Sequence, residues 1–230
     1  MELGTEAQGL RASRRNVVRG AAWSVPVVAV ATAAPAFAAS PCPAVTLVWS
    51  SLGNGTTFTS TTVGGVVVTL SLTGQTTAPN NRTVSTTQTG GQSSNLRFYS
   101  TADANSSQTA TFSFTRNGQP VTVTNLSFSF LDIDSGGNSW NDTVRVNTAG
   151  FGYVITNQTF VTGVGSSASP FRANGTNTSS NTAGTSTNGN VQVSWATALS
   201  SMSFTYAQAV AASGSPFIGI SNMSFQPVIC

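Results

Sequence analysis

From Val45 onward, apolar residues alternate with threonine and serine along most of the chain. A period of two residues predicts β-strands with one buried and one solvated face. Gly, Asn and Pro residues separate these stretches, so the strands are expected to be short. The predicted strands are residues 45–51, 66–72, 96–100, 109–115, 121–133, 142–147, 153–156, 191–196, 202–207 and 217–226.

About ten short strands without intervening helices indicate an all-β antiparallel β-sandwich, of a jelly-roll-like kind. A parallel sheet would need helical crossovers, and only residues 205–213 have a pattern compatible with one helical turn. The phenylalanines supply much of the expected core, and Trp49 and Trp195 lie at core positions of the strand pattern. The stretch after the first 38 residues is long enough for a single domain with its own core.

Two segments depart from the alternation and consist almost entirely of Thr, Ser, Asn, Gly and Gln: residues 73–95 and 162–190. Such a composition buries little apolar surface, so we expect long, mobile polar loops. A threonine-lined ice-binding or adhesive face is the functional alternative. That face would need a regular Thr-x-Thr spacing on a flat sheet, which these segments lack, although TTFTSTT (residues 56–62) keeps the alternative open.

The N-terminal region has the layout of an export signal, with the basic stretch SRRNVVR (13–19) before the apolar residues 21–38. Small residues at Ala36 and Ala38 predict cleavage after Ala38. Residues 1–38 are therefore expected to be a signal peptide and residues 39–230 the exported domain. Two prolines and weak hydrophobicity argue against an uncleaved anchor, and we expect no stable membrane span after cleavage.

The charged residues exclude several classes of function. Beyond residue 38 the chain has five arginines and four aspartates, so it has no basic patch of the kind that binds nucleic acid. The same part of the chain contains no His, Lys or Glu. Ser-His and Cys-His nucleophiles, Schiff-base lysines and histidine metal sites are therefore excluded. A pair of aspartates acting on a glycoside is the one common mechanism left.

The two cysteines, Cys42 and Cys230, lie at opposite ends of the expected mature chain. In an oxidising compartment this arrangement predicts one intrachain disulfide, with free thiols or an intermolecular bond as the alternatives. Closing so long a loop stabilises the folded state by at most about 5 kcal/mol in the chain-entropy model. The bond would make the first and last strands neighbours.

Three of the four aspartates beyond residue 38 lie within LDIDSGGNSWNDTVRV, residues 131–146. Alternation places Asp132 and Asp134 side by side on the face opposite Leu131 and Ile133. A turn then returns the chain to Asp142. Because clustered negative charges repel one another, we expect a hard cation among them, and Ca²⁺ suits flexible oxygen-rich loops. The predicted metal ligands are Asp132, Asp134, Asn138 and Asp142.

Other interpretations of this hairpin remain open. Arg145 could pair with one aspartate and brace a turn without metal, the turn could simply be solvated, or two aspartates could form a catalytic pair. Trp140 lies inside the same loop and is a candidate ligand-binding residue, because an aromatic ring beside a carboxylate can hold a sugar. The alternative for Trp140 is that it covers the edge of the sandwich.

Four stretches carry a resemblance to a known class of protein: SRRNVVRGAAWSVPVVAVATAAPAFAAS (13–40), NLSFSFLDIDSGGNSWNDTVRV (125–146), SMSFTYAQ (201–208) and FIGISNMSFQPVIC (217–230). The chain resembles the twin-arginine-exported, secreted or cell-surface β-sandwich proteins of actinobacteria. The resemblance implies an extracellular jelly-roll-type domain whose LDID hairpin holds calcium, and it implies no catalytic residues. We therefore expect a non-enzymatic binding or adhesive module for carbohydrate or another cell-surface component. An aspartate-based glycoside hydrolase and a purely structural envelope protein are the alternatives.

Overall fold

The computed structural model describes residues 42–101, 103, 105–175, 184–210 and 214–230. The predicted signal peptide, residues 1–38, lies outside this part of the chain. Within it, no helix combines the length and hydrophobicity needed to cross a membrane.

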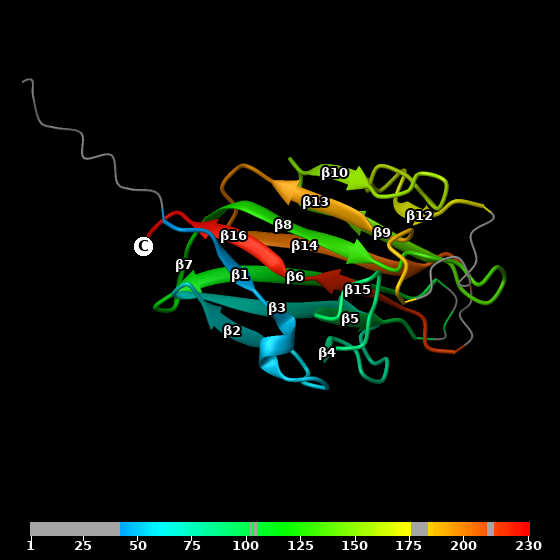
Figure 1. Cartoon of the computed structure of the whole chain (residues 1–230), viewed down its shortest axis with the longest axis horizontal. Coiled ribbons are helices and arrows are strands. Elements are labelled where there is room, and N and C mark those ends of the chain that lie inside the picture. Colours follow the sequence, from blue (N-terminus) through cyan, green and yellow to red (C-terminus); the bar gives the residue numbers. More distant parts are fainter. Residues whose placement is uncertain (1–41, 102, 104, 176–183, 211–213) are drawn as a thin grey trace, which may run out of the picture. The chain divides into compact units, whose positions relative to one another are not determined.

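The described residues form two antiparallel sheets that pack face to face (Figure 1). One 3-10 helix, η1 (Trp49–Leu52), follows the first strand. Sheet A contains β1 (Val45–Leu47), β4 (Thr83–Ser85), β5 (Asn95–Tyr99), β8 (Val123–Leu131), β10 (Gly152–Ile155), β13 (Val191–Trp195), β15 (Phe217–Ser221) and β16 (Met223–Pro227). Sheet B contains β2 (Ser60–Val63), β3 (Val66–Gly74), β6 (Ser107–Arg116), β7 (Gln119–Pro120), β9 (Asp142–Val146), β11 (Val161–Thr162), β12 (Phe171–Ala173) and β14 (Ser201–Gln208).

Strand β8 is the centre of sheet A. On one side it pairs with β13, which in turn pairs with β10. On its other side β15 and β16 follow one another, with β5 and β4 beyond β15 and β1 beyond β16. Sheet B has the order β11-β12-β9-β14-β6-β3-β2, with β7 paired to β6. The pairing of β1 with β16 confirms that the first and last strands are neighbours.

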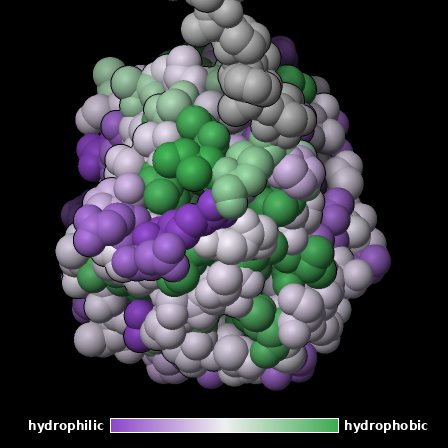
Figure 2. Space-filling model, turned by 90° about the vertical axis from the view of Figure 1, so that its left-hand side faces the viewer, coloured by the Kyte–Doolittle hydropathy of each residue, from purple (hydrophilic) through white to green (hydrophobic). Residues whose placement is uncertain are grey.

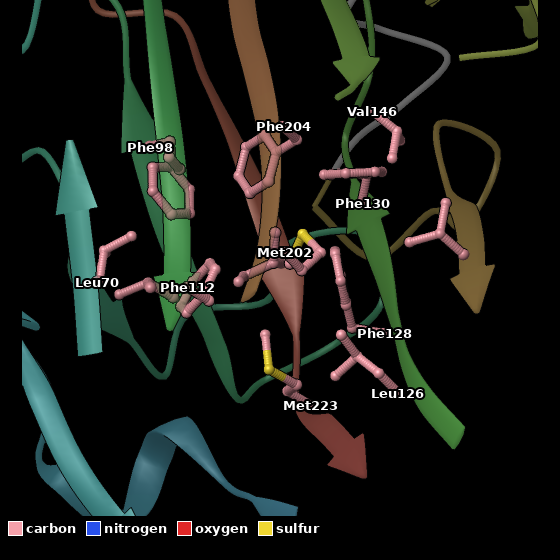
Figure 3. Packing of buried hydrophobic residues seen from close by; sticks show 14 of the residues in the cluster. Leu70, Phe98, Phe112, Leu126, Phe128, Phe130, Val146, Met202, Phe204 and Met223 are labelled. Carbon is pink, nitrogen blue, oxygen red and sulfur yellow. The ribbon is translucent and has the colours of Figure 1, made fainter. Parts of the chain in front are cut away.

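The inward-facing residues of both sheets form the core, part of which Figure 3 shows. Phe204 of sheet B lies with its ring centroid 5.2 Å from Phe98 and 4.9 Å from Phe130, both of sheet A. Trp49 and Trp195 are completely buried, as predicted, but Trp49 belongs to η1, because the strand predicted over residues 45–51 ends at Leu47. The alternation of apolar and hydroxyl residues therefore places the apolar set between the sheets, where removal from water stabilises the fold.

The structure confirms the antiparallel sandwich but contains more strands than the ten expected. The additional strands β4, β7, β11 and β12 are two or three residues long and β2 has four residues, too few to show a clear period of two. Predicted strand 217–226 is divided into β15 and β16 at Asn222. The side-chain carbonyl of Asn222 accepts a hydrogen bond from the Trp49 backbone N–H at 3.1 Å, so the break is tied to η1.

The two polar segments contain more structure than their composition indicates. Strand β4 lies inside residues 73–95, and Asn81 and Thr89 of the same segment are buried. Strand β12 lies inside residues 162–190, of which residues 176–183 are outside the described part. Side chains of Asn and Thr replace apolar contacts here with hydrogen bonds, a contribution that hydrophobic periodicity does not detect.

The predicted disulfide is present: Cys42 is bonded to Cys230, and their Cα atoms are 5.6 Å apart. We call this end of the sandwich the disulfide end. Figure 2 shows it with hydrophobic residues gathered beside a strip of hydrophilic ones. Val228 and Ile229 are exposed there. The hairpin that carries the clustered aspartates follows the far end of β8, at the opposite end of the sandwich, which we call the carboxylate end.

Candidate functional site

Asp142 is the first residue of β9, and it points into the sandwich. The inward residues of β9 are Asp142, Val144 and Val146, all buried. Across the β9–β14 ladder, Asp142 pairs with Gln208 and Val144 with Tyr206. Because paired residues in an antiparallel sheet share a face, Asp142, Tyr206 and Gln208 all point between the sheets. Asp142 has no exposed surface.

The carboxylate of Asp142 is held by hydrogen bonds from neutral donors. Its Oδ1 accepts from the Tyr206 hydroxyl at 2.8 Å and from Gln208 Nε2 at 2.6 Å. Its Oδ2 lies 3.4 Å from the backbone N–H of Asp134. Burial, and then the neighbouring charge of Asp134, raises the pKa of Asp142 well above its usual value, although these hydrogen bonds oppose the shift. Asp142 is thus a buried structural group, and its surroundings oppose its ionisation more than water opposes that of an exposed aspartate.

Asp134 lies next to Asp142 and is also almost inaccessible, at 8% exposure. Its Oδ1 accepts a hydrogen bond from Trp140 Nε1 at 2.8 Å. Its backbone carbonyl accepts from the Asp142 N–H at 3.0 Å. The structure therefore brings Asp134 and Asp142 together, by closing the hairpin between them.

Asp132 is placed differently because its backbone lies in the left-handed region, with φ at 66°. This conformation breaks the alternation that predicted a shared face for Leu131 and Ile133. Ile133 joins the core, whereas Leu131 pairs with Gly219 on the outer face of sheet A. Burial raises the pKa of Asp132 to about 7, with Asp134 adding to the shift and Arg97 opposing it. Its Oδ1 is buried and has no hydrogen-bond partner among the described residues.

The four predicted calcium ligands do not converge on one point. Asn138 is exposed at the tip of the turn, whereas Asp142 is completely buried. Among the described residues there is no group of three or more His, Cys, Asp or Glu side chains placed to hold a metal ion. Asn141 offers a different oxygen: its Oδ1 is buried and, like that of Asp132, has no hydrogen-bond partner in the part of the chain that the structure describes.

The alternative in which Arg145 pairs with an aspartate of the hairpin is not seen among the described residues. Arg145 lies on the outer face of sheet B, where its guanidinium donates to Asn147, Ser167 and Thr205. The cation near Asp132 is Arg97 of β5. The guanidinium of Arg97 also donates to Thr89 Oγ1 at 2.8 Å and lies 4.5 Å from the centroid of the Phe217 ring. Arg145 is close to Asp142 in sequence, but the alternation of side chains along β9 places these two residues, three positions apart, on opposite faces of sheet B.

Trp140 covers the hairpin. Its ring lies over Gly136, where an added Cβ would be 2.5 Å from ring carbons, and its N–H is used by Asp134. The side chain is half-buried. This geometry agrees with the edge-covering interpretation, because the ring packs against backbone on one side.

The outer face of sheet B carries a second feature, which we call the hydroxyl face. Its serines and threonines are aligned across neighbouring strands in rows. The rows are Ser60-Thr69-Ser113-Ser201, Ser71-Thr111-Ser203 and Thr73-Thr109-Thr205, and Arg145 continues the last of these. Within the last row Thr109 and Thr205 share a hydrogen bond of 2.8 Å. Spacings of about 4.8 Å between strands and about 6.7 Å along each strand make this a regular array of donors and acceptors.

A shallow hollow of about 190 Å³ lies at the Arg145 end of the hydroxyl face, lined in part by Ser107, Thr143 and Ser167. All the hydrogen-bond partners of Arg145 there are neutral. The face therefore combines uncharged hydroxyls with two arginines, Arg145 and Arg172, because Arg172 of β12 pairs with the outward Thr143 of β9. Asp142 of β9 points away from this face.

Sequence reasoning missed the roles of Tyr206, Gln208 and Arg97 in the carboxylate cluster. Tyr206 and Gln208 continue the inward alternation of β14 after Phe204, and a polar residue at an inward position was the signal that could have found them. No local signal connects Arg97 to Asp132. Comparison of the chain with models of protein families, with characterised proteins and with solved structures found no match.

Proposed function

We propose that this protein is a secreted or cell-surface, non-enzymatic binding module that attaches to a carbohydrate surface through the hydroxyl face of sheet B. The observation that carries this proposal is the alignment of serine and threonine side chains in rows across β2, β3, β6 and β14. Hydroxyl groups both donate and accept hydrogen bonds, as the hydroxyls of a polysaccharide do. An array of them suits a polar, uncharged and repetitive partner.

The carboxylate cluster supports a non-enzymatic role. Glycoside hydrolysis needs two carboxyl groups that reach the substrate from opposite sides. Asp142 is completely buried and Asp134 nearly so, and donors from Tyr206, Gln208 and Trp140 already occupy their oxygens. These contacts favour a structural cluster over a catalytic pair.

Export through a signal peptide is a further part of the proposal. The disulfide between Cys42 and Cys230 supports an oxidising compartment, because such bonds are rarely maintained in the cytosol. N-terminal sequencing of the exported protein tests the prediction that cleavage follows Ala38, and a mature chain beginning elsewhere would reject it.

The binding proposal is tested by retention on insoluble neutral polysaccharides such as cellulose and chitin. Thr111 lies near the centre of the hydroxyl face, so Thr111→Arg should reduce retention at least tenfold by placing a long charged side chain in the array. The matched control is Ser194→Arg, since Ser194 is an exposed hydroxyl residue on β13 of sheet A. Equal retention of the two variants would reject the hydroxyl face as the binding surface. No retention of the parent protein on any matrix would favour the purely structural alternative.

The proposal also includes calcium, bound by the folded protein at the carboxylate end. The unpartnered, buried oxygens of Asp132 and Asn141 support a cation contact at the carboxylate end, because buried acceptors normally have a partner. A thermal melt with millimolar calcium and with chelator tests it. A ligand that binds only the folded state raises the melting temperature, and Asp132→Asn should abolish that rise. Identical melting temperatures with calcium and with chelator would remove calcium from the proposal.

A further inference from the structure

A further hollow is lined by none of the hairpin aspartates and by none of the residues in the rows of the hydroxyl face. It has a volume of about 490 Å³ and is lined by the end of β3, by the segment before β2 and by residues 76–82. We call it the Arg82 groove. Its lining includes the polar residues Thr57, Thr76, Asn80 and Arg82 and the apolar residues Leu72 and Ala78.

Arg82 is half-buried in this groove, and among the described residues its guanidinium has neither a hydrogen-bond acceptor nor a carboxylate partner. Arg97, Arg116 and Arg145 each donate to several acceptors instead. Withdrawing a guanidinium from water without a partner is unfavourable. Arg82 therefore presents an unused set of donors to whatever occupies the groove.

The backbone around Arg82 is strained. Asn80 and Arg82 both adopt left-handed conformations, with φ at 60° and 53°. Asparagine adopts this region fairly often, but a longer side chain such as arginine rarely does. Strain of this kind persists where the surrounding structure enforces it and is found more often at binding sites.

The buried side chain of Asn81 enforces this conformation. Its Oδ1 accepts hydrogen bonds from the backbone N–H groups of Arg82 at 2.9 Å and Tyr99 at 3.1 Å. Its Nδ2 donates to Gln108 Oε1 at 2.7 Å. The backbone carbonyl of Arg82 accepts from the Phe58 N–H at 2.8 Å. The guanidinium is thus presented by a loop that is anchored to both sheets before any ligand arrives, which lowers the entropy lost on binding.

We infer that the Arg82 groove binds a carboxylated sugar, a uronic-acid residue of an acidic saccharide. The planar guanidinium of Arg82 matches a carboxylate with two parallel hydrogen bonds. Thr57, Thr76 and Asn80 supply donors and acceptors for ring hydroxyls. Leu72 and Ala78 offer an apolar surface to the C–H face of the ring. This site is separate from the hydroxyl face and goes beyond the neutral carbohydrate binding proposed above.

The test is calorimetric titration of the oxidised protein with a glucuronic-acid disaccharide and with the corresponding neutral glucose disaccharide. The acidic sugar should bind at least tenfold more tightly. The decisive variant is Arg82→Asn, which removes the guanidinium but suits the left-handed backbone, so the protein should stay folded. It should weaken binding of the acidic disaccharide at least tenfold.

Arg172→Asn is the matched control, because Arg172 is an exposed arginine of β12 that does not line the groove. It should bind the acidic disaccharide like the parent. Equal affinities for the two disaccharides, equal affinities of Arg82→Asn and the parent, or no binding at roughly 10 mM ligand would overturn the inference. Retention on cellulose depends on Thr111 and not on Arg82, so failure of one proposal is distinguishable from failure of the other.

Discussion

Two regions lie between the same pair of sheets, and different forces stabilise them. In the apolar middle, rings such as those of Phe112, Phe130 and Phe204 pack without polar partners. At the carboxylate end, the inward positions of β6 and β14 are occupied by Gln108 and Gln208, and that of the neighbouring β9 by Asp142. The apolar middle is stabilised by shape complementarity and buried apolar area, whereas the carboxylate end is stabilised by side-chain hydrogen bonds such as those to Asp142. The stability of the two regions should therefore respond differently to the truncation of a side chain and to pH.

The apolar middle should show the largest effect of a single substitution. Phe204→Ala removes a ring that touches Phe98 and Phe130 and leaves a cavity, so the free energy of unfolding should fall by about 3–5 kcal/mol. Urea denaturation measures the loss. It should be equally large at about pH 5 and about pH 8, because no titratable group is involved. A loss below about 1 kcal/mol would show that the middle repacks easily.

At the carboxylate end, Asp142→Ala should lower the free energy of unfolding by roughly 2–4 kcal/mol, because the donors of Tyr206 and Gln208 lose their acceptor. Asp142→Asn keeps an acceptor and should lower it by less than about 1 kcal/mol. The same urea titration compares the two variants. If both lose equal stability, the negative charge matters and the hydrogen-bond network does not.

The two regions should separate most clearly in their response to pH. The folded-state pKa of Asp132 is raised to about 7 and that of Asp142 is raised well above its usual value. Between about pH 4 and about pH 7 the folded protein holds the Asp132 proton, which the unfolded chain has released, so stability falls as pH rises, and the raised pKa of Asp142 acts in the same direction.

The free energy of unfolding should fall by roughly 1–3 kcal/mol between about pH 5 and about pH 8, since each unit of difference between the folded-state and unfolded-state pKa corresponds to about 1.4 kcal/mol. Thermal melts across this range measure it. The double variant Asp132→Asn with Asp142→Asn should remove most of the slope, whereas Phe204→Ala should leave it in place. Stability that rises over the same range would contradict the assignment of these two groups.

The smallest effect is expected from Tyr206→Phe, which removes one hydroxyl from the network and should lower the free energy of unfolding by about 1 kcal/mol. The hydrogen bond from Tyr206 lowers the pKa of Asp142, so its loss should move that pKa further upward. Carboxyl ¹³C chemical shifts followed against pH report this change. An unchanged titration of Asp142 would mean that the hydrogen bond from the Tyr206 hydroxyl has little effect on the pKa of Asp142.

The strand pattern was predictable wherever strands are long. In β6 every second residue from Ser107 to Thr115 carries a hydroxyl, and the intervening residues include Phe112 and Phe114. In β4 and β12, three residues are too few to show a period. The site was predictable only in part. The hairpin brings Asp134 and Asp142 together, but the left-handed backbone at Asp132 breaks the expected alternation, and Asn138 is exposed at the tip of the turn.

The sequence by itself determined where the long strands lie, which of their faces is buried and that two distant cysteines could join. A period of two and the chemistry of each side chain are local properties of the chain. Only the tertiary structure decided the register that aligns Thr111 with Ser71 and Ser203, the choice of Arg97 as the cation near Asp132, and the burial of Asp142 against Tyr206. These contacts join residues far apart in the chain, and pairing between strands, rather than any pattern within one strand, determines which of them meet.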